Sequence, residues 1–169
     1  MLRDRRVTLL KVNQLSDMRL ILKDRSVVLI DLENTVVPYG AARALASTTA
    51  LLDRFKEGCD MDRVIFVTNS SDVELVELVG AITGCKVISE AHKPFTSKRR
   101  IAAQTTATPG LVLGDQILTD GILAWRLGCP FIQFQLERTG EPAWPRIIRG
   151  FGSFFVGFFF KKYSGDDLG

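Results

Sequence analysis

The sequence has few of the features that mark several classes of protein. Its three cysteines (Cys59, Cys85 and Cys129) are odd in number and form no close pair, which excludes a full disulfide framework and leaves no zinc-ligand spacing. The net charge of +3 is too small to indicate a nucleic-acid partner. No apolar run reaches the ~18 residues of a membrane span, and the N-terminus lacks the apolar core of a signal peptide. We therefore expect a cytoplasmic protein with buried, reduced cysteines.

The composition is that of an ordinary globular protein. Hydrophobic residues make up 46% of the 169 residues and charged residues 24%, which argues against a disordered, collagen-like or coiled-coil chain. The length suits one domain. One anomaly stands out, because six of the eleven phenylalanines lie between Phe151 and Phe160.

Short apolar runs alternate with helical patterns along the chain. Continuous apolar runs predict strands at 26–30, 64–67 and 111–113, with weaker candidates at 86–89 and 130–135. Helical spacing predicts helices at 42–57, 72–83, 95–105 and 119–127, three of them stopped by Gly58, Gly84 and Gly128. This order predicts an α/β fold, a parallel sheet flanked by helices with right-handed crossovers.

Three of the predicted strands end in a polar residue: Asp31, Thr68 and Asp115. A carboxylate directly after an apolar strand is costly unless it has a partner or a function. Because ligands of open parallel sheets bind outside the carboxyl ends of the strands, these three residues predict a site there.

The residues around these strand ends match four ordered motifs between residues 26 and 120. The segment Asp31–Val37 (DLENTVV) resembles motif I of the haloacid dehalogenase (HAD) phosphohydrolase superfamily, and Val67–Asn69 (VTN) resembles motif II. Lys93, followed by proline, matches motif III, and Gly114–Asp120 (GDQILTD) resembles motif IV. The combination is similar to HAD subfamily IIIA of the YqeG type, which includes phosphatidylglycerophosphate phosphatases. The resemblance implies a Rossmann-like HAD domain.

The resemblance also implies a role for each matched residue. Asp31 would be the nucleophile that forms an aspartyl-phosphate. Mg²⁺ would be held by Asp31, the backbone carbonyl of Glu33, Asp115 and, as one of two interpretations, Asp120. The substrate phosphate would be bound by Thr68, Asn69, Lys93 and backbone N–H groups from Leu32 onward.

Each of these residues also has an ordinary structural explanation. Thr68 and Asn69 could cap a helix from Ser70, and Asp115 and Asp120 could be turn and helix-cap residues instead of metal ligands. Lys93 could be a solvated lysine before a proline turn. His92, the one histidine, is interpreted as a loop residue.

Glu33 departs from the family pattern, which has aspartate two residues after the nucleophile as general acid and base. Glutamate has a similar pKa, but its extra methylene moves the carboxyl by about 1 Å, enough to cost roughly a hundredfold in rate. Two states follow from this substitution: a working phosphatase with Glu33 as the acid, and a domain that binds Mg²⁺ and phosphate with little turnover.

The spacing of the motifs leaves no room for a cap domain. Asp31 and Thr68 are 37 residues apart and Lys93 and Asp115 are 22 apart, and one helix accounts for each gap. An open site suits a substrate held by something larger, such as a lipid in a bilayer.

The chain end is predicted as a separate Phe-rich amphipathic tail, residues 146–169, after a capless HAD-like domain at 1–145 that includes an N-terminal lead-in. As a helix, residues 145–162 place Ile147, Phe151, Phe154, Phe155 and Phe158 on one side, and basic residues flank the uncharged run. This predicts contact with an anionic membrane surface through 146–162, with internal packing or a homo-oligomer interface as the alternatives.

Three functions stay open at this point. The first is a Mg²⁺-dependent phosphohydrolase, peripheral on a membrane, that acts on a lipid phosphate monoester such as phosphatidylglycerophosphate. The second is an inactive HAD-fold module that binds a membrane or protein partner. The third is a phosphatase for a soluble phosphate monoester.

Overall fold

The computed structural model describes residues 6–12, 27–38, 45–96, 98–134 and 154–162. They form a seven-stranded sheet in the order β4-β3-β2-β5-β6-β1-β7, and every pair of neighbours is parallel. The chain is therefore an α/β protein with a Rossmann-like sheet, as predicted.

The five strands predicted from apolar runs all form the sheet. They are β2 (Val28–Ile30), β3 (Val64–Val67), β4 (Lys86–Ile88), β5 (Leu111–Gly114) and β6 (Phe131–Phe134). Strand β2 lies between β3 and β5, with Ile30 in register with Phe66 on one side and Leu113 on the other. The central strands are buried on both faces, which explains their unalternating hydrophobic sequence.

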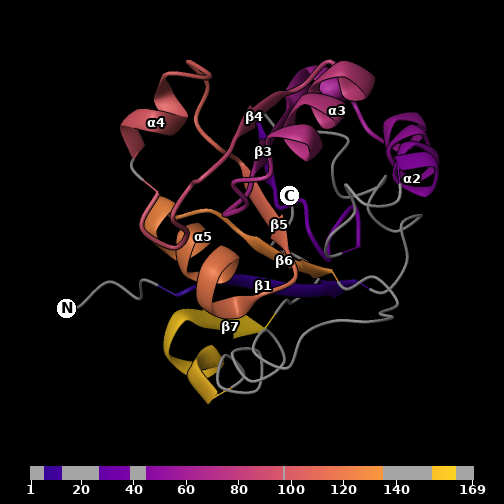
Figure 1. Ribbon diagram of the computed structural model, residues 1–169. Helices are drawn as coiled ribbons and strands as arrows, with labels where there is room; N and C mark the ends of the chain where they lie inside the picture. The colour runs from indigo at the N-terminus through magenta and orange to yellow at the C-terminus, as the bar shows by residue number, and fades with distance from the viewer. Residues whose placement is uncertain (1–5, 13–26, 39–44, 97, 135–153, 163–169) are drawn as a thin grey trace.

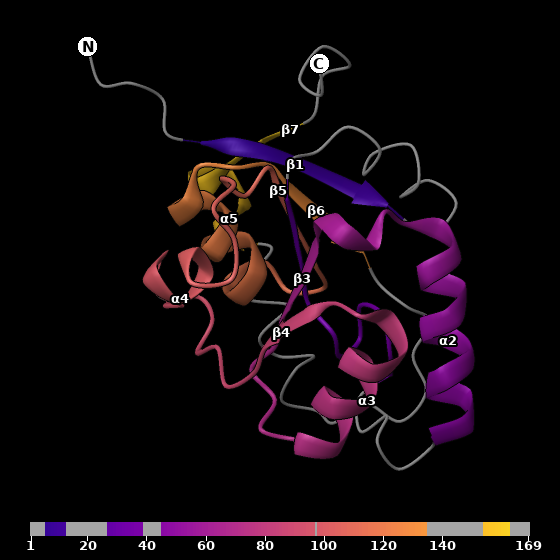
Figure 2. The same cartoon turned by 90° about the horizontal axis from the view of Figure 1, so that it is seen from above.

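Helices cover both faces of the sheet (Figures 1 and 2). Helices α2 (Leu45–Gly58) and α3 (Val73–Thr83) lie on one side. The other side carries α4 (Lys98–Ala102), the π-helical turn η3 (Ile117–Gly121) and α5 (Ile122–Leu127). A short 3-10 turn, η2 (Met61–Arg63), precedes β3. Helix α4 is shorter than the predicted 95–105, and residues 42–44 of the first predicted helix lie outside the described residues.

The alternation of side chains along each strand divides the core in two. Val28 and Ile30 pack with Leu52 and Phe55 of α2 in one cluster. The opposite cluster is built on the other face of the same strands, for example by Leu29, Val67, Val112 and Phe131, and includes residues of α4, η3 and α5. The sheet thus lies between two hydrophobic clusters, and packing on both faces fixes the positions of the carboxyl ends of its strands.

Two strands were not predicted from the sequence. Residues of the expected N-terminal lead-in form β1 (Val7–Val12), which lies between β6 and β7 in the sheet. The expected tail helix is wrong at its end, because residues 154–159 are helical but Phe160–Lys162 forms β7, the edge strand beside β1. The part of that prediction at 145–153 lies outside the described residues. An edge strand of three residues with two lysines is poorly suited to pair with another chain.

None of the helices among the described residues has the length and apolar character needed to cross a membrane.

Candidate active site at the carboxyl ends of the strands

The central strands deliver three predicted site residues to one edge of the sheet. Asp31 follows β2, and its N–H donates to the Leu113 carbonyl of β5 at 2.9 Å. Thr68 follows β3, and its N–H donates to the Ile88 carbonyl of β4 at 2.9 Å. Asp115 follows β5 and is 1% exposed. Ladder hydrogen bonds thus continue past the ends of β2 and β3 and hold Asp31 and Thr68 in place.

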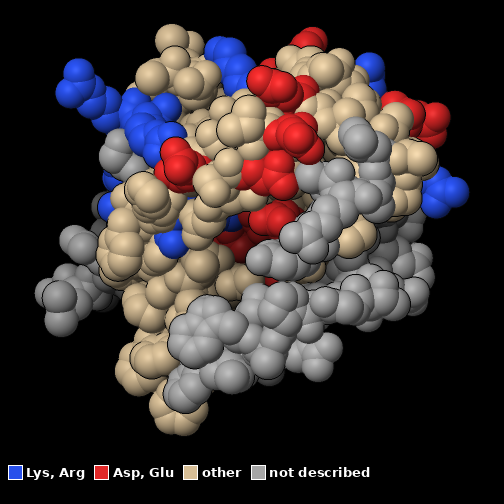
Figure 3. Space-filling view, in the orientation of Figure 1, with Lys and Arg blue, Asp and Glu red and all other residues tan. Residues whose placement is uncertain are grey.

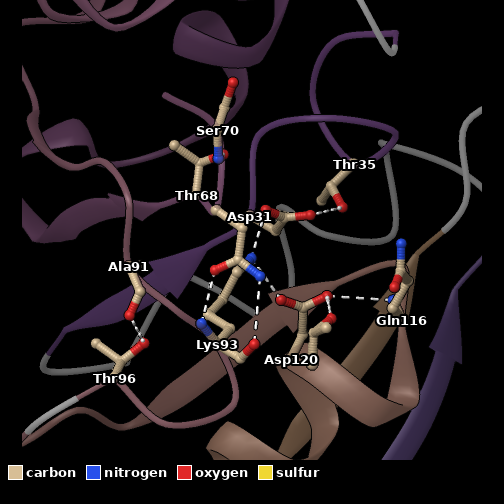
Figure 4. A network of polar contacts seen from close by, with 11 residues as sticks. Asp31, Thr35, Thr68, Ser70, Ala91, Lys93, Thr96, Gln116 and Asp120 are labelled. Carbon is tan, nitrogen blue, oxygen red and sulfur yellow. Dashed lines mark hydrogen bonds and ion pairs between the residues drawn. The ribbon is translucent and has the colours of Figure 1, made fainter. Parts of the chain in front are cut away.

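A buried ionic network joins Asp31 to residues from two other segments (Figure 4). The Lys93 Nζ lies 2.5 Å from Asp31 Oδ1 and 2.6 Å from Asp120 Oδ1. The Lys93 and Asp120 side chains are 3% and 1% exposed, and that of Asp31 is 11% exposed. Lys93 is therefore not a solvated lysine before a proline turn, because its ammonium is enclosed by carboxylates.

Burial and charge shift the pKa values of this network in a way typical of functional sites. Burial raises the pKa of Asp31 to about 7, against the opposing effect of Lys93 and with a further increase from Asp120. Burial alone lowers the pKa of Lys93, but Asp120 and Asp31 together raise it above its ordinary value. Lys93 is accordingly a permanent cation, whereas Asp31 changes its charge near neutrality.

Three carboxylates converge beside this lysine. Asp31, Asp115 and Asp120 each offer an oxygen atom, and these atoms all lie within 4.8 Å of one another. One lysine cannot neutralise three carboxylates, so the site carries excess negative charge when all are ionised. Carboxylate oxygens are typical ligands of hard divalent cations, Mg²⁺ among them. These residues therefore fit the predicted metal. On the surface, Figure 3 shows acidic side chains gathered near the middle of this face of the molecule.

Asp120 is not the N-cap residue of η3 or of α5, which are Gln116 and Gly121, and its metal binding stays a prediction. It belongs to the carboxylate group, and its Oδ2 also accepts hydrogen bonds from the Gln116 N–H at 3.2 Å and the Thr119 hydroxyl at 3.3 Å. The π-helical turn η3 carries it over Gly114, where an added Cβ would overlap the Asp120 carboxyl. Gly114 therefore makes room for a member of the carboxylate group, a role that sequence reasoning did not assign.

The loop that carries Lys93 is fixed by several neighbours. Asn69 accepts from the Lys93 N–H at 2.6 Å and donates from Nδ2 to the Lys93 carbonyl at 3.3 Å. The Ala91 N–H donates to the Thr68 carbonyl at 2.9 Å, and Arg126 of α5 donates to the carbonyl of Pro94. Both ends of the Asn69 amide thus hold the lysine loop. The expected contact of Asn69 with substrate phosphate stays a prediction.

The loop shows backbone strain as well. Glu90 and His92 have φ angles of 44° and 54°, which are uncommon for residues with side chains. His92 lies in a loop, as predicted. The capping alternative for Thr68 and Asn69 is wrong, because α3 begins at Val73 with Asp72 as its N-cap, accepting from the Leu75 N–H at 3.1 Å.

The segment after the nucleophile folds back on itself. The N–H groups of Thr35, Val36 and Val37 all donate to the Leu32 carbonyl, and the Asn34 N–H donates to the Val37 carbonyl. These four donors are used within the loop, so the expected backbone cradle for phosphate is reduced to the N–H groups before Asn34. Thr35, which the sequence did not single out for a role, is fully buried, and its hydroxyl lies 3.5 Å from Asp31 Oδ2.

Glu33 stands apart from the carboxylate group. Its side chain is partly exposed, and its carboxylate is not among the three that converge. Glu33 forms an isolated β-bridge with Val37. Although it lies two residues from Asp31 in the sequence, Glu33 does not belong to the group of Asp31, Asp115 and Asp120.

Comparison with family models, with curated proteins and with solved structures gave no match to this chain. The function of the chain is therefore inferred from the site and from the motifs in its sequence.

Proposed function

We propose that this chain is a Mg²⁺-dependent phosphohydrolase that acts through an aspartyl-phosphate on Asp31. The supporting observation is the group of three carboxylates around one buried lysine at the carboxyl ends of the central strands. Phosphoryl transfer needs positive charge to let a carboxylate approach an anionic phosphate, and Lys93 supplies part of it. Asp31, Asp115 and Asp120 would hold Mg²⁺, which would add charge on the phosphate oxygens and favour ionised Asp31.

In the first step, an Asp31 carboxylate oxygen attacks phosphorus and the bond from phosphorus to the ester oxygen breaks. Because Lys93 binds Oδ1, we assign the attack to Oδ2, the oxygen beside the Thr35 hydroxyl. Glu33 gives its proton to the departing alkoxide. In the second step, Glu33 takes a proton from water, the water oxygen attacks phosphorus, and inorganic phosphate leaves with Asp31 regenerated.

The motif resemblance and the short predicted gaps between motifs point to a substrate on a lipid headgroup, with phosphatidylglycerophosphate first. The test is phosphate release from this lipid in mixed micelles, with and without Mg²⁺, beside a soluble aryl phosphate. We expect Mg²⁺-dependent release that falls at least about a thousandfold in Asp31→Asn. Preference for the aryl phosphate would instead indicate a soluble substrate.

One observation favours a second function, a binding module with little turnover. Glutamate replaces the family's acid, and the Glu33 carboxylate lies outside the carboxylate group. Glu33→Gln separates the two functions. The phosphatase predicts loss of turnover with Mg²⁺ binding retained, whereas unchanged turnover would remove Glu33 from the mechanism. A wild-type protein that binds Mg²⁺ but releases no phosphate from either substrate would establish the module.

A further inference from the structure

A cluster of phenylalanine side chains is exposed on the helical segment 154–159. Phe154, Phe155 and Phe158 are 80%, 38% and 72% exposed, and we call these three residues the aromatic patch. Their rings are contiguous, with centroids 6.1 Å apart for Phe154 and Phe155 and 6.4 Å apart for Phe155 and Phe158. Single exposed apolar residues are ordinary, but a contiguous aromatic group on a short helix indicates an interaction surface.

The inner side of the same segment is anchored, so the patch cannot turn inward. The Phe159 ring meets Trp125 of α5 edge-on at 5.0 Å, and Val156 packs against the same core. Phe160 is 3% exposed and its ring centroid lies 5.8 Å from that of Phe131. A Cβ at Gly121 would lie 2.8 Å from the Phe160 ring, so glycine is what admits this anchor. The fold thus holds three phenylalanines outward at a fixed place.

The charge beside the patch selects its partner. Lys161 is exposed directly after the segment, and Lys162 follows it. From residue 142 to residue 165 the sequence has four basic residues and no acidic one. Aromatic side chains flanked by lysine and arginine match a bilayer with anionic headgroups, because the rings enter the apolar boundary while the cations pair with phosphate.

From these observations we infer that the aromatic patch docks onto an anionic phospholipid bilayer, with helix 154–159 lying in the interface. The surface is separate from the carboxylate group, and the inference does not depend on the proposed chemistry. Helix α5 nevertheless lies between the helix of the aromatic patch and the lysine loop and contacts both. Trp125 contacts Phe159 in the helix of the patch. The next residue, Arg126, donates to the Pro94 carbonyl in the lysine loop, and its Cζ lies 5.7 Å from the centroid of the Phe95 ring.

Vesicle flotation of the whole chain tests this inference. The vesicles contain phosphatidylcholine alone, or equal parts of phosphatidylcholine and phosphatidylglycerol. We expect the wild type to float with the phosphatidylglycerol vesicles only, and to be released as salt rises. The triple variant Phe154→Ser/Phe155→Ser/Phe158→Ser should lose at least tenfold in partitioning while keeping its circular dichroism. Phe154→Ser and Phe158→Ser singly provide the comparison if the triple variant does not fold.

Two controls make the outcome decisive. Val73→Ser removes another exposed apolar side chain, 65% exposed on α3, and should float like the wild type. Asp31→Asn should also float like the wild type, which keeps this result distinct from any failure of the proposed phosphatase. A wild type that stays off anionic vesicles would overturn the inference, as would serine variants that bind them equally well. So would a patch whose loss only converts a dimer to a monomer in light scattering.

Discussion

The carboxylate site and the aromatic patch depart from the usual distribution of residues in opposite directions. At the carboxyl ends of the central strands, the structure buries three carboxylates and a lysine. Beside β7, at the edge of the same sheet, it exposes three phenylalanines. Buried charges are costly to desolvate, and exposed aromatic groups forgo the free energy of burial.

The two regions differ in how much of this cost the chain itself offsets. At the site, Lys93 pairs with two of the carboxylates, and the proposed Mg²⁺ would offset the remaining negative charge. At the edge strand, Phe159 packs against Trp125 and Phe160 packs against Phe131, while the side chains of the aromatic patch are exposed to solvent. In both regions one side is held by contacts within the protein and the other side is left for a partner. A packing defect would lack the first of these, so the comparison indicates two binding surfaces.

The largest effect is expected from breaking the charge balance at the site. Lys93→Met should cost about 3–5 kcal/mol in the free energy of unfolding, because Asp31 and Asp120 then face each other without a cation. Urea unfolding followed by circular dichroism measures this, and added Mg²⁺ should restore part of the loss. Lys86→Met is the matched control, since that lysine is exposed and donates to the Gln104 carbonyl. Equal losses in the two variants would contradict the buried network.

At the edge of the sheet, the contrast between anchor and patch can be measured directly. Phe160→Ala should cost about 3 kcal/mol, because it opens a cavity between Phe131 and Gly121. Phe158→Ala should change stability by less than about 0.5 kcal/mol, since its ring is exposed. Thermal and urea unfolding of the pair would show the anchor to be misidentified if both substitutions cost the same.

A smaller effect is expected where the backbone makes room for Asp120. Gly114→Ala should cost about 2 kcal/mol and weaken Mg²⁺ binding, because the new methyl group overlaps the Asp120 carboxyl. Gly80→Ala in α3 is the control, because its Cβ would meet nothing closer than the Cys85 carbonyl at 4.0 Å. There we expect a gain of up to about 1 kcal/mol. Calorimetric Mg²⁺ titration gives the affinity, and unchanged affinity in Gly114→Ala would separate Asp120 from the metal.

The raised pKa of Asp31 predicts a pH dependence. In the metal-free protein, the stability that Asp31 contributes is complete below its ordinary pKa of 3.8 and is lost as the pH rises through about 7. Mg²⁺ must displace the proton, so its affinity should be about tenfold weaker at pH 6 than at pH 8. Titration calorimetry at both pH values measures this, with Asp31→Asn as a variant whose affinity is lower but flatter with pH. A flat wild-type profile would count against the raised pKa.

The smallest effect is expected at Asn69. Asn69→Ala removes both hydrogen bonds to the Lys93 backbone, and kcat should fall about tenfold while the KM for substrate changes little. If Asn69 bound the substrate phosphate directly, the substitution would raise KM instead. Steady-state kinetics on the same phosphate ester therefore distinguishes positioning from binding.

The central strands could be predicted from sequence because burial on both faces gives an unbroken apolar run, as in β3 and β5. Strand β1 could not, because Thr8 and Lys11 interrupt its apolar residues and its partners are distant in sequence. Phe160–Lys162 was assigned to a helix because phenylalanine suits both helical periodicity and an edge strand.

At the site, the strand ends predicted Asp31, Thr68 and Asp115 from local pattern. Lys93 and Asp120 entered only through the motif resemblance, because nothing local indicates that a lysine 62 residues from Asp31 will contact it. The hydrogen bonds from Asn69 to the Lys93 backbone could not be predicted, since an amide binds a backbone and a phosphate with the same atoms.

The position of β1 has a consequence for how the chain acquires its shape. Its first partner, β6, lies about 120 residues further along the sequence, and β7 lies further still. During synthesis β1 therefore has no partner strand until β6 has been made, after β2, β3, β4 and β5. Every residue of the carboxylate site is made before β6 and β7, so the edge of the sheet that carries the aromatic patch is the last part that can be completed.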